Sequence, residues 1–136
     1  MNKGNRLIMA IVFTVLIILS GRLASAQDPL EVGPDIYKLL FENDKVRVME
    51  IMFKPGDKIA MHSHPDHLAY IMSEGTLLLS YPDGTTKEMA GKSGDVFWIN
   101  AEAHAAENIG TTEVKGLVVE LKEQKIEKMM PTDSNK

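Results

Sequence analysis

The chain has 136 residues, 44% of them hydrophobic and 25% charged, and it carries a formal net charge of −4 at pH 7. This balance is that of an ordinary globular protein and excludes a wholly disordered chain. The lack of cysteine excludes disulfides, a thiolate metal site and a lipid-modified cysteine. Once a predicted leader of 26 residues is set aside, the remaining 110 suffice for one compact domain but not for two.

The first 26 residues have the layout of a secretory signal peptide. Lys3 and Arg6 precede an apolar run, Leu7–Leu19, and the small residues Ala24-Ser25-Ala26 follow. This predicts cleavage after residue 26 and export, either to a periplasm or as a secreted protein. The run has thirteen residues, fewer than the roughly 20 that cross a bilayer as a helix. An uncleaved membrane anchor is the alternative, and Arg22 close behind the run keeps it open.

After the leader, residues 27–43 form a lead-in segment, in which Asp35–Glu42 fits either a short helix or a first strand. From residue 44 to residue 122, turn signals recur every eight to ten residues and separate short β-prone segments. Such regular short strands indicate an antiparallel sandwich or barrel. The predicted strands include Val46–Phe53, Ala69–Met72, Thr76–Tyr81, Val96–Ile99 and Val114–Leu121.

Pro82-Asp83-Gly84 predicts a tight hairpin after Tyr81, because Asp-Gly readily supplies the positive φ that such turns require. Residues 123–136 are predicted to form a polar tail, which is disordered over Met129–Lys136.

The charge of the chain after the leader argues against a nucleic acid partner. The leader holds three basic residues and no acidic one, so 12 basic and 19 acidic residues remain, a net charge of −7. A nucleic-acid-binding surface concentrates Lys and Arg on one face. The local basic cluster instead alternates with glutamates, which favours a solvated helix face. Its residues are Lys122, Lys125 and Lys128, with Glu120, Glu123 and Glu127.

All four histidines lie in the β-rich region: His62, His64 and His67 close together, and His104 forty residues after His64. Residues i and i+2 of a strand point to the same face, so His62 and His64 can present both imidazoles to one point. A distant strand carrying His104 would complete a three-nitrogen set. Such a set suits Fe(II), Mn(II), Ni(II), Cu(II) or Zn(II), with positions open to water or substrate. Surface histidines in loops and a hydrogen-bonded polar core are the alternatives.

The residues on both sides of the histidine pair form a recognisable pattern. Gly56 is followed after five residues by His62-Ser63-His64, and Gly75 closes the segment. The pattern resembles the first motif of the cupin superfamily, which reads Gly, five residues, His-x-His, three or four residues, Glu, six residues, Gly. The small single-domain members of the superfamily are the most similar.

The glutamate of that motif is missing from this sequence. Its position falls on Leu68 with the three-residue spacing and on Ala69 with the four-residue spacing. His67, one place before Leu68, is the nearby side chain that could replace it as a ligand. The alternatives are a His67 that supports another ligand, or one that faces solvent.

The second cupin motif is matched only in part. Gly94 begins it correctly, but Asn100 stands at the expected Pro and Glu102 at the expected second Gly. The last part of the motif matches again, with three residues between His104 and Asn108.

The resemblance spans about Val46 to Leu121 and implies an all-β, single-domain, double-stranded β-helix, or jelly-roll, barrel of six or more strands. It further implies a divalent transition metal inside the wider mouth, held by His62, His64 and His104.

Cupins that lack the glutamate and keep three histidines resemble those that cleave β-diketones or oxidise thiols with iron and dioxygen. The resemblance therefore implies a metal-dependent, dioxygenase-like oxidoreductase acting on a small chelating anion. Three neutral imidazoles leave the metal its full charge of +2, which favours anionic bidentate ligands. Tyr70, Met72 and Phe97 are expected to line the substrate pocket, with core packing as the alternative. Glu102 and Glu107, near His104, are either proton acceptors or solvated carboxylates.

Two other classes of function stay open at this stage. The first is a non-catalytic cupin that binds or sequesters a metal or a small molecule, which the small size of the chain favours. The second is an interaction module that forms a homodimer. Val114–Leu121 and Ile36–Phe41 are its candidate contacts, and both segments are equally compatible with the core.

Overall fold

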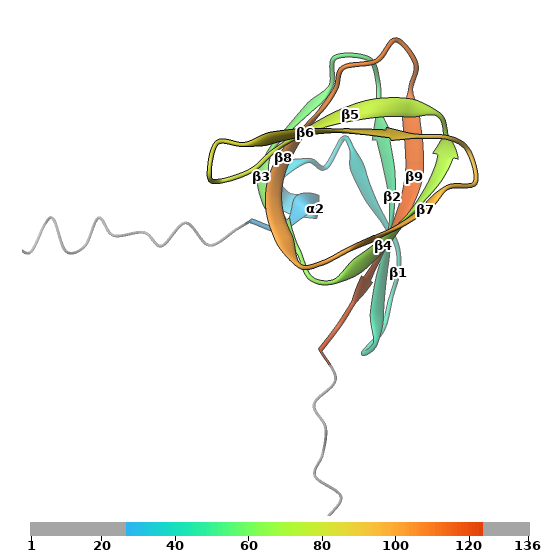
Figure 1. Ribbon diagram of the computed structural model, residues 1–136. Coiled ribbons are helices and arrows are strands. Elements are labelled where there is room, and N and C mark those ends of the chain that lie inside the picture. The colour runs from blue at the N-terminus through green and yellow to red at the C-terminus, as the bar shows by residue number, and fades with distance from the viewer. Residues whose placement is uncertain (1–26, 124–136) are drawn as a thin grey trace, which may run out of the picture.

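The computed structural model describes residues 27–123, so the predicted signal peptide and residues 124–136 of the predicted tail lie outside the described residues. The described part contains a short helix and strands in two antiparallel sheets, which curl around a common interior (Figure 1). The five-stranded sheet has the order β1-β2-β9-β4-β7, and the four-stranded sheet has the order β3-β8-β5-β6. The elements are α2 (Pro29–Val32), β1 (Tyr37–Glu42), β2 (Val46–Phe53), β3 (Lys58–His64), β4 (His67–Ser73), β5 (Gly75–Ser80), β6 (Thr86–Gly91), β7 (Val96–Ile99), β8 (Glu102–Asn108) and β9 (Val114–Leu121).

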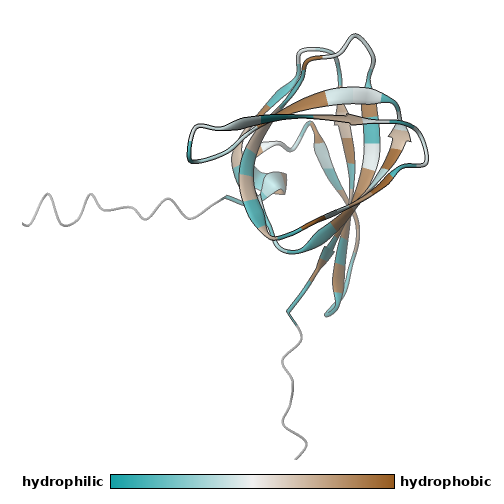
Figure 2. Cartoon of the chain, viewed as in Figure 1, coloured by the Kyte–Doolittle hydropathy of each residue, from teal (hydrophilic) through white to brown (hydrophobic). Residues whose placement is uncertain are grey.

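Alternation of side chains fixes which face of each strand looks inward. In β2, Met49, Ile51 and Phe53 are buried and the residues between them are partly exposed. The same period of two runs along most strands as alternating hydropathy (Figure 2). In β9 the inward positions are Val114, Gly116, Val118 and Glu120. Glu120 therefore places a carboxylate on the same face of β9 as the core residues.

The predicted hairpin at residues 82–84 is confirmed. Gly84 has φ +84°, and β5 and β6 pair up to Ser80 opposite Thr86. Asp83 accepts hydrogen bonds from the backbone N–H and the hydroxyl of Thr85, at 2.9 and 2.6 Å. The Asp side chain and the φ of the following glycine together close the turn.

The lead-in segment is part of the barrel rather than a separate extension. Asp28 caps α2 by accepting a 2.9 Å hydrogen bond from the Leu30 N–H, and β1 pairs with β2 along the edge of the five-stranded sheet. Of the two structures left open for this segment, a strand forms over Tyr37–Glu42. Tyr37 opposes Ile51 in the register and is buried, so this strand delivers an aromatic side chain to the interior.

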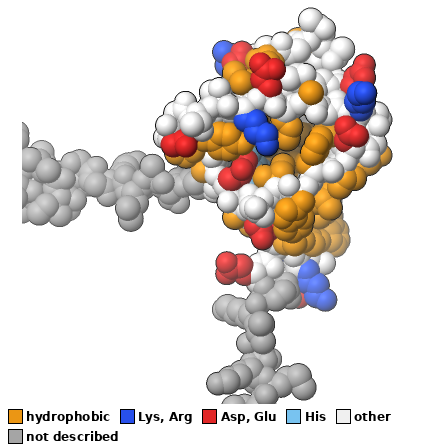
Figure 3. Space-filling view, in the orientation of Figure 1, with side chains coloured by type: hydrophobic (Ala, Val, Ile, Leu, Met, Phe, Trp, Pro, Cys, Tyr) orange, Lys and Arg blue, Asp and Glu red, His pale blue; other side chains and the backbone are white. Residues whose placement is uncertain are grey.

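A row of apolar residues crosses the outer face of the five-stranded sheet. Backbone pairing places Phe41 beside Val48, Val48 beside Val119, Val119 beside Leu68, and Leu68 beside Trp98. Phe41 and Trp98 are 53% and 55% exposed at the two ends of the row, so Trp98 is less packed than its apolar neighbours in the sequence suggest. Hydrophobic side chains gather over β4 and β7 in Figure 3. Within residues 27–123, the structure contains no helix long and apolar enough to cross a membrane.

Candidate metal centre

The two sheet strands β3 and β8 bring three histidines together as predicted. His62 and His64 occupy alternate positions of β3, and His104 of β8 lies directly opposite His62. One potential ligand atom from each ring lies within 4.8 Å of the others. All three residues are at most 5% exposed, which excludes the alternative of surface histidines in loops. The three side chains lie close enough together to hold a metal ion.

Hydrogen bonds orient these three rings so that the same nitrogen of each is left for a metal. The Nδ1 of His62 donates to the Ala60 carbonyl at 2.8 Å, that of His64 to Glu120 Oε1 at 2.6 Å, and that of His104 to Glu102 Oε1 at 2.9 Å. Carbonyl and carboxylate oxygens only accept hydrogen bonds, so Nδ1 carries the proton and Nε2 keeps its lone pair. Neutral rings arranged in this way have no proton left to donate to one another, which argues against a mutually bonded polar core. This orientation is typical of metal-ligating histidines.

Burial keeps the rings neutral and therefore able to ligate. It lowers the pKa of His62 to about 4, aided by His64 and His104 and opposed by the Ala60 hydrogen bond. Burial, with His64 and His67 as neighbours, lowers the pKa of His104 to about 4 as well. At neutral pH both rings are therefore uncharged, even without a bound metal.

The stability of the metal-free protein should fall as the pH falls from about 6.5 to about 4. An unfolded histidine has a pKa of about 6.5, and His62 and His104 have values of about 4 in the folded state. The unfolded state therefore binds more protons between these values, and acidification favours it. Urea unfolding midpoints at pH 7.0, 5.5 and 4.5, in the presence of a chelator, measure this. A His62→Asn/His104→Asn variant should show a flatter profile. A wild-type midpoint that is constant over this range would contradict the expectation.

A buried carboxylate fixes His64 in place. Glu120 is 2% exposed and accepts hydrogen bonds from His64 Nδ1 at 2.6 Å and from Arg47 Nε at 2.7 Å. Arg47 also forms an ion pair with Asp28. Burial opposes ionisation of Glu120, but the hydrogen bonds from His64 and Arg47 and the Arg47 charge outweigh it and lower the pKa of Glu120. The assignment of Glu120 to a solvated helix face was therefore wrong, because the residue ends the inward row of β9.

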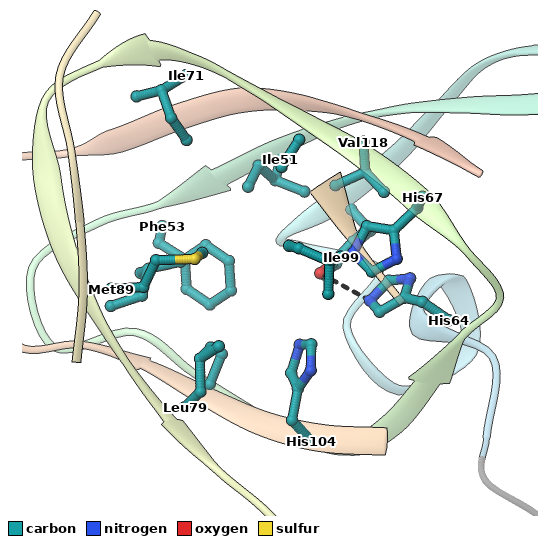
Figure 4. Close-up of a pocket in the computed structure, with 14 residues that line it drawn as sticks. Ile51, Phe53, His64, His67, Ile71, Leu79, Met89, Ile99, His104 and Val118 are labelled. Atoms are coloured by element: carbon teal, nitrogen blue, oxygen red, sulfur yellow. Dashed lines mark hydrogen bonds between the residues drawn. The ribbon is translucent and has the colours of Figure 1, made fainter. Parts of the chain in front are cut away.

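Tyr37 is the site residue that sequence reasoning missed. Its hydroxyl lies 3.4 Å from Nε2 of His62 and 3.4 Å from Nε2 of His64. In Figure 4 a dashed line marks the contact of the hydroxyl oxygen with His64. Burial, and then the charge of Glu120, raise the pKa of this hydroxyl. No motif marks Tyr37, and the only available signal was a possible strand in the lead-in segment.

His67 lies beside the three-histidine cluster but does not belong to it. It is 2% exposed, so it does not face solvent, and its ring centroid lies 4.7 Å from that of His64. Its Nδ1 donates to the Pro65 carbonyl at 2.8 Å, which again leaves Nε2 with the lone pair. His67 occupies an inward position of β4, whereas Leu68, at the motif's glutamate position, is the partly exposed residue that follows.

A small cavity of about 40 Å³ adjoins the histidines inside the barrel (Figure 4). His64, His67 and His104 contribute to its wall, and the rest is mainly apolar. Its other lining residues are Tyr37, Ile51, Phe53, Ala69, Ile71, Leu77, Leu79, Met89, Ile99, Ala106 and Val118. A space of this size holds an ion with a few waters or a small ligand, not a bulky one.

The three residues predicted to line a substrate pocket do not line this cavity. Tyr70 and Met72 are 39% and 41% exposed on the outer face of β4, and the prediction for them was wrong by one position. Ala69 and Ile71 point inward instead, because the inward position of His67 sets the alternation along β4. Phe97 opposes Ala69 in β7 and is half-buried, but it is not among the lining residues.

The two glutamates near His104 have different environments. Glu102 accepts a 2.9 Å hydrogen bond from His104 Nδ1 and so orients the His104 ring. Its side chain is 26% exposed. Glu107 forms an ion pair with Lys58 at 3.1 Å, and 34% of the Glu107 side chain is exposed. Glu107 is thus a solvated carboxylate, the second of the two alternatives weighed for it.

Comparison with known proteins agrees with this architecture. The family model for the cupin domain matches residues 49–120. No curated protein matches the chain. Among solved structures, a cupin domain from Bordetella pertussis is 28% identical with a TM-score of 0.60, and the match covers 65% of this chain and 93% of that one.

Two further structures share the fold at lower identity. A conserved protein with a double-stranded beta-helix domain from Klebsiella pneumoniae is 24% identical, with a TM-score of 0.51 and coverage of 65% of this chain and 84% of that one. A cupin superfamily protein from Desulfitobacterium hafniense is 21% identical, with a TM-score of 0.50 and coverage of 65% and 77%. Because the cupin model matches more than half of the residues and the two-sheet barrel agrees with it, the chain belongs to the cupin family.

Proposed function

We propose that the protein binds a divalent transition metal through His62, His64 and His104 and uses it to hold a small chelating anion, as a dioxygenase-like oxidoreductase does. The observation that carries the proposal is the shared orientation of the three rings, each with Nδ1 bonded to an oxygen and Nε2 left with its lone pair. Metal ligands need this state of the ring, and a ring that is already held in place loses little freedom on binding.

The donor set fits several metals. Imidazole nitrogen accepts iron, manganese, nickel, copper and zinc, and supply commonly decides which ion is found. When bound, such an ion supplies Lewis acidity and a point of attachment for an anion. Glu120 and Glu102 raise the basicity of His64 and His104 through their Nδ1 hydrogen bonds and so strengthen these two ligands.

The cavity favours a small ligand with an apolar part. The three histidine ligands are neutral, so they leave the metal's charge for an anion such as an enolate, a carboxylate or a thiolate. Ile99, Leu79 and Met89 are among the apolar residues of the wall (Figure 4). These side chains exclude water from one side of a bound anion and strengthen its attraction to the metal.

A bidentate anion should bind the metal-loaded protein far more tightly than a monodentate one. Because the second contact to the same metal is intramolecular, oxalate should bind about 10²-fold or more tightly than acetate. Calorimetric titration of Zn(II)-loaded and metal-free protein with both anions measures this. Equal binding of oxalate with and without metal would contradict the proposal.

Oxygen consumption separates an enzyme from a binding protein at the same site. The Fe(II)-loaded protein with a β-diketone or a thiol should consume dioxygen if it is dioxygenase-like. Saturable binding of metal and anion without consumption would instead favour the alternative, a cupin that sequesters a metal or a small molecule.

We further propose that the mature chain works outside the cytoplasm. The support is the order of basic residues, apolar run and small residues in positions 1–26.

A further inference from the structure

We propose that Tyr37 supplies an oxygen ligand to the metal at His62, His64 and His104, and so takes the role of the motif glutamate that this chain lacks. The inference rests on the proposed metal site and adds a ligand from the lead-in segment to it. Three observations carry it: the distances of the hydroxyl from two ligand nitrogens, the burial of the ring, and the way the sheet holds it.

The distances fit a ligand better than a hydrogen-bond partner. The Tyr37 hydroxyl lies 3.4 Å from both His62 Nε2 and His64 Nε2, which is longer than the roughly 2.5–3.2 Å of most protein hydrogen bonds. A single hydroxyl proton also cannot serve two acceptors well. Neighbouring ligand atoms that are about 2.0–2.1 Å from one ion lie roughly 3.0 Å apart in octahedral geometry and 3.4 Å apart in tetrahedral geometry. The oxygen therefore lies where a ligand adjacent to both histidines is expected.

The ring is held in this position before any metal binds. Tyr37 pairs with Ile51 across β1 and β2, its N–H donates to the Gly33 carbonyl at 2.8 Å, and its ring packs edge-on against Phe53 with centroids 6.5 Å apart. Tyr37 is 5% exposed. A phenol fixed in this way needs no rearrangement to reach the metal, and water does not compete for it.

Ligation exchanges one bond for another without any change of oxidation state. The phenol O–H bond would break as the oxygen–metal bond forms, and the proton would leave to solvent. The charge of a bound cation would have to offset burial and the Glu120 charge, which raise the pKa of Tyr37 in the metal-free protein. The phenolate lowers the charge of a divalent site from +2 to +1, as a glutamate would. Together with the three nitrogens it would give a donor set of three neutral ligands and one anionic ligand.

Visible absorption of the metal-loaded protein tests the inference directly. Phenolate bound to Fe(III) or Cu(II) gives a charge-transfer band, which histidine ligands alone do not. The wild-type protein loaded with either ion should show the band, Tyr37→Phe should lose it and bind the ion about 10-fold or more weakly, and Tyr81→Phe should keep it. Tyr81 is the matched control, because its ring also lies near the site, with its centroid 6.4 Å from that of His104.

The outcomes separate this inference from the proposed function. A wild-type protein that binds one ion without the band would overturn the role of Tyr37 and leave the three-histidine site intact. A band that survives in Tyr37→Phe and disappears in Tyr81→Phe would overturn it as well. If no ion binds to the folded wild-type protein, the three-histidine site itself fails.

Discussion

Replacing Glu120 with alanine should destabilise the metal-free protein by about 3 kcal/mol, among the largest effects expected for a single substitution here. The change removes the buried acceptor of both Arg47 and His64. The Arg47 side chain is only 15% exposed, so its charge would be left without its main partner. Because Asp28 still contacts Arg47, the cost lies at the low end of the range for broken buried ion pairs. Urea unfolding at pH 7 measures it.

An exposed ion pair provides the matched control for this substitution. Glu107→Ala removes the partner of Lys58 on the surface, where such pairs contribute about 0.5 kcal/mol or less. A Glu120→Ala protein as stable as Glu107→Ala would contradict the expected stabilisation by the buried carboxylate.

The milder variant Glu120→Gln should weaken metal binding by about 10–100-fold, because His64 loses a charged acceptor at Nδ1.

The second large effect concerns the ligands themselves. The His62→Ala/His104→Ala variant should bind no metal, because a single imidazole of the cluster is left, whereas His67→Ala should keep about one equivalent. Metal titration of the three proteins, each checked for folding by circular dichroism, measures this. If His67→Ala lost the metal as completely as the double variant, His67 would be a ligand and the three-nitrogen site would be wrong.

Local alternation and motif spacing were enough to predict the main part of the site. His62 and His64 share a face because they stand two positions apart in a strand, and the partial second motif indicated His104 as their partner. The hairpin at Gly84 was also predictable, because the residues that form the turn are adjacent in the sequence.

Residues that depend on long-range pairing were harder to predict. Glu120 stands beside a lysine cluster in the sequence, yet the pairing of β9 with β2 and β4 turns it inward toward Arg47 and His64. Tyr37 reaches the site only because β1 joins the edge of the sheet 25 residues before His62 in the chain.

The assignment of Tyr70 and Met72 to the pocket failed for a different reason. A shift of one position moves every side chain of a strand to its other face. The inward position of His67 fixes the alternation of β4, so that Tyr70 and Met72 lie on the outer face. Burial of His67 was the missing observation, and the sequence alone did not contain it.

Elemental analysis of residues 27–136, purified without a polyhistidine tag, tests the central claim most directly. A site of three oriented, neutral imidazoles predicts about one equivalent of iron, manganese, nickel, copper or zinc per chain, either as purified or after reconstitution. A folded protein that retains none of these ions after reconstitution with each of them would contradict it.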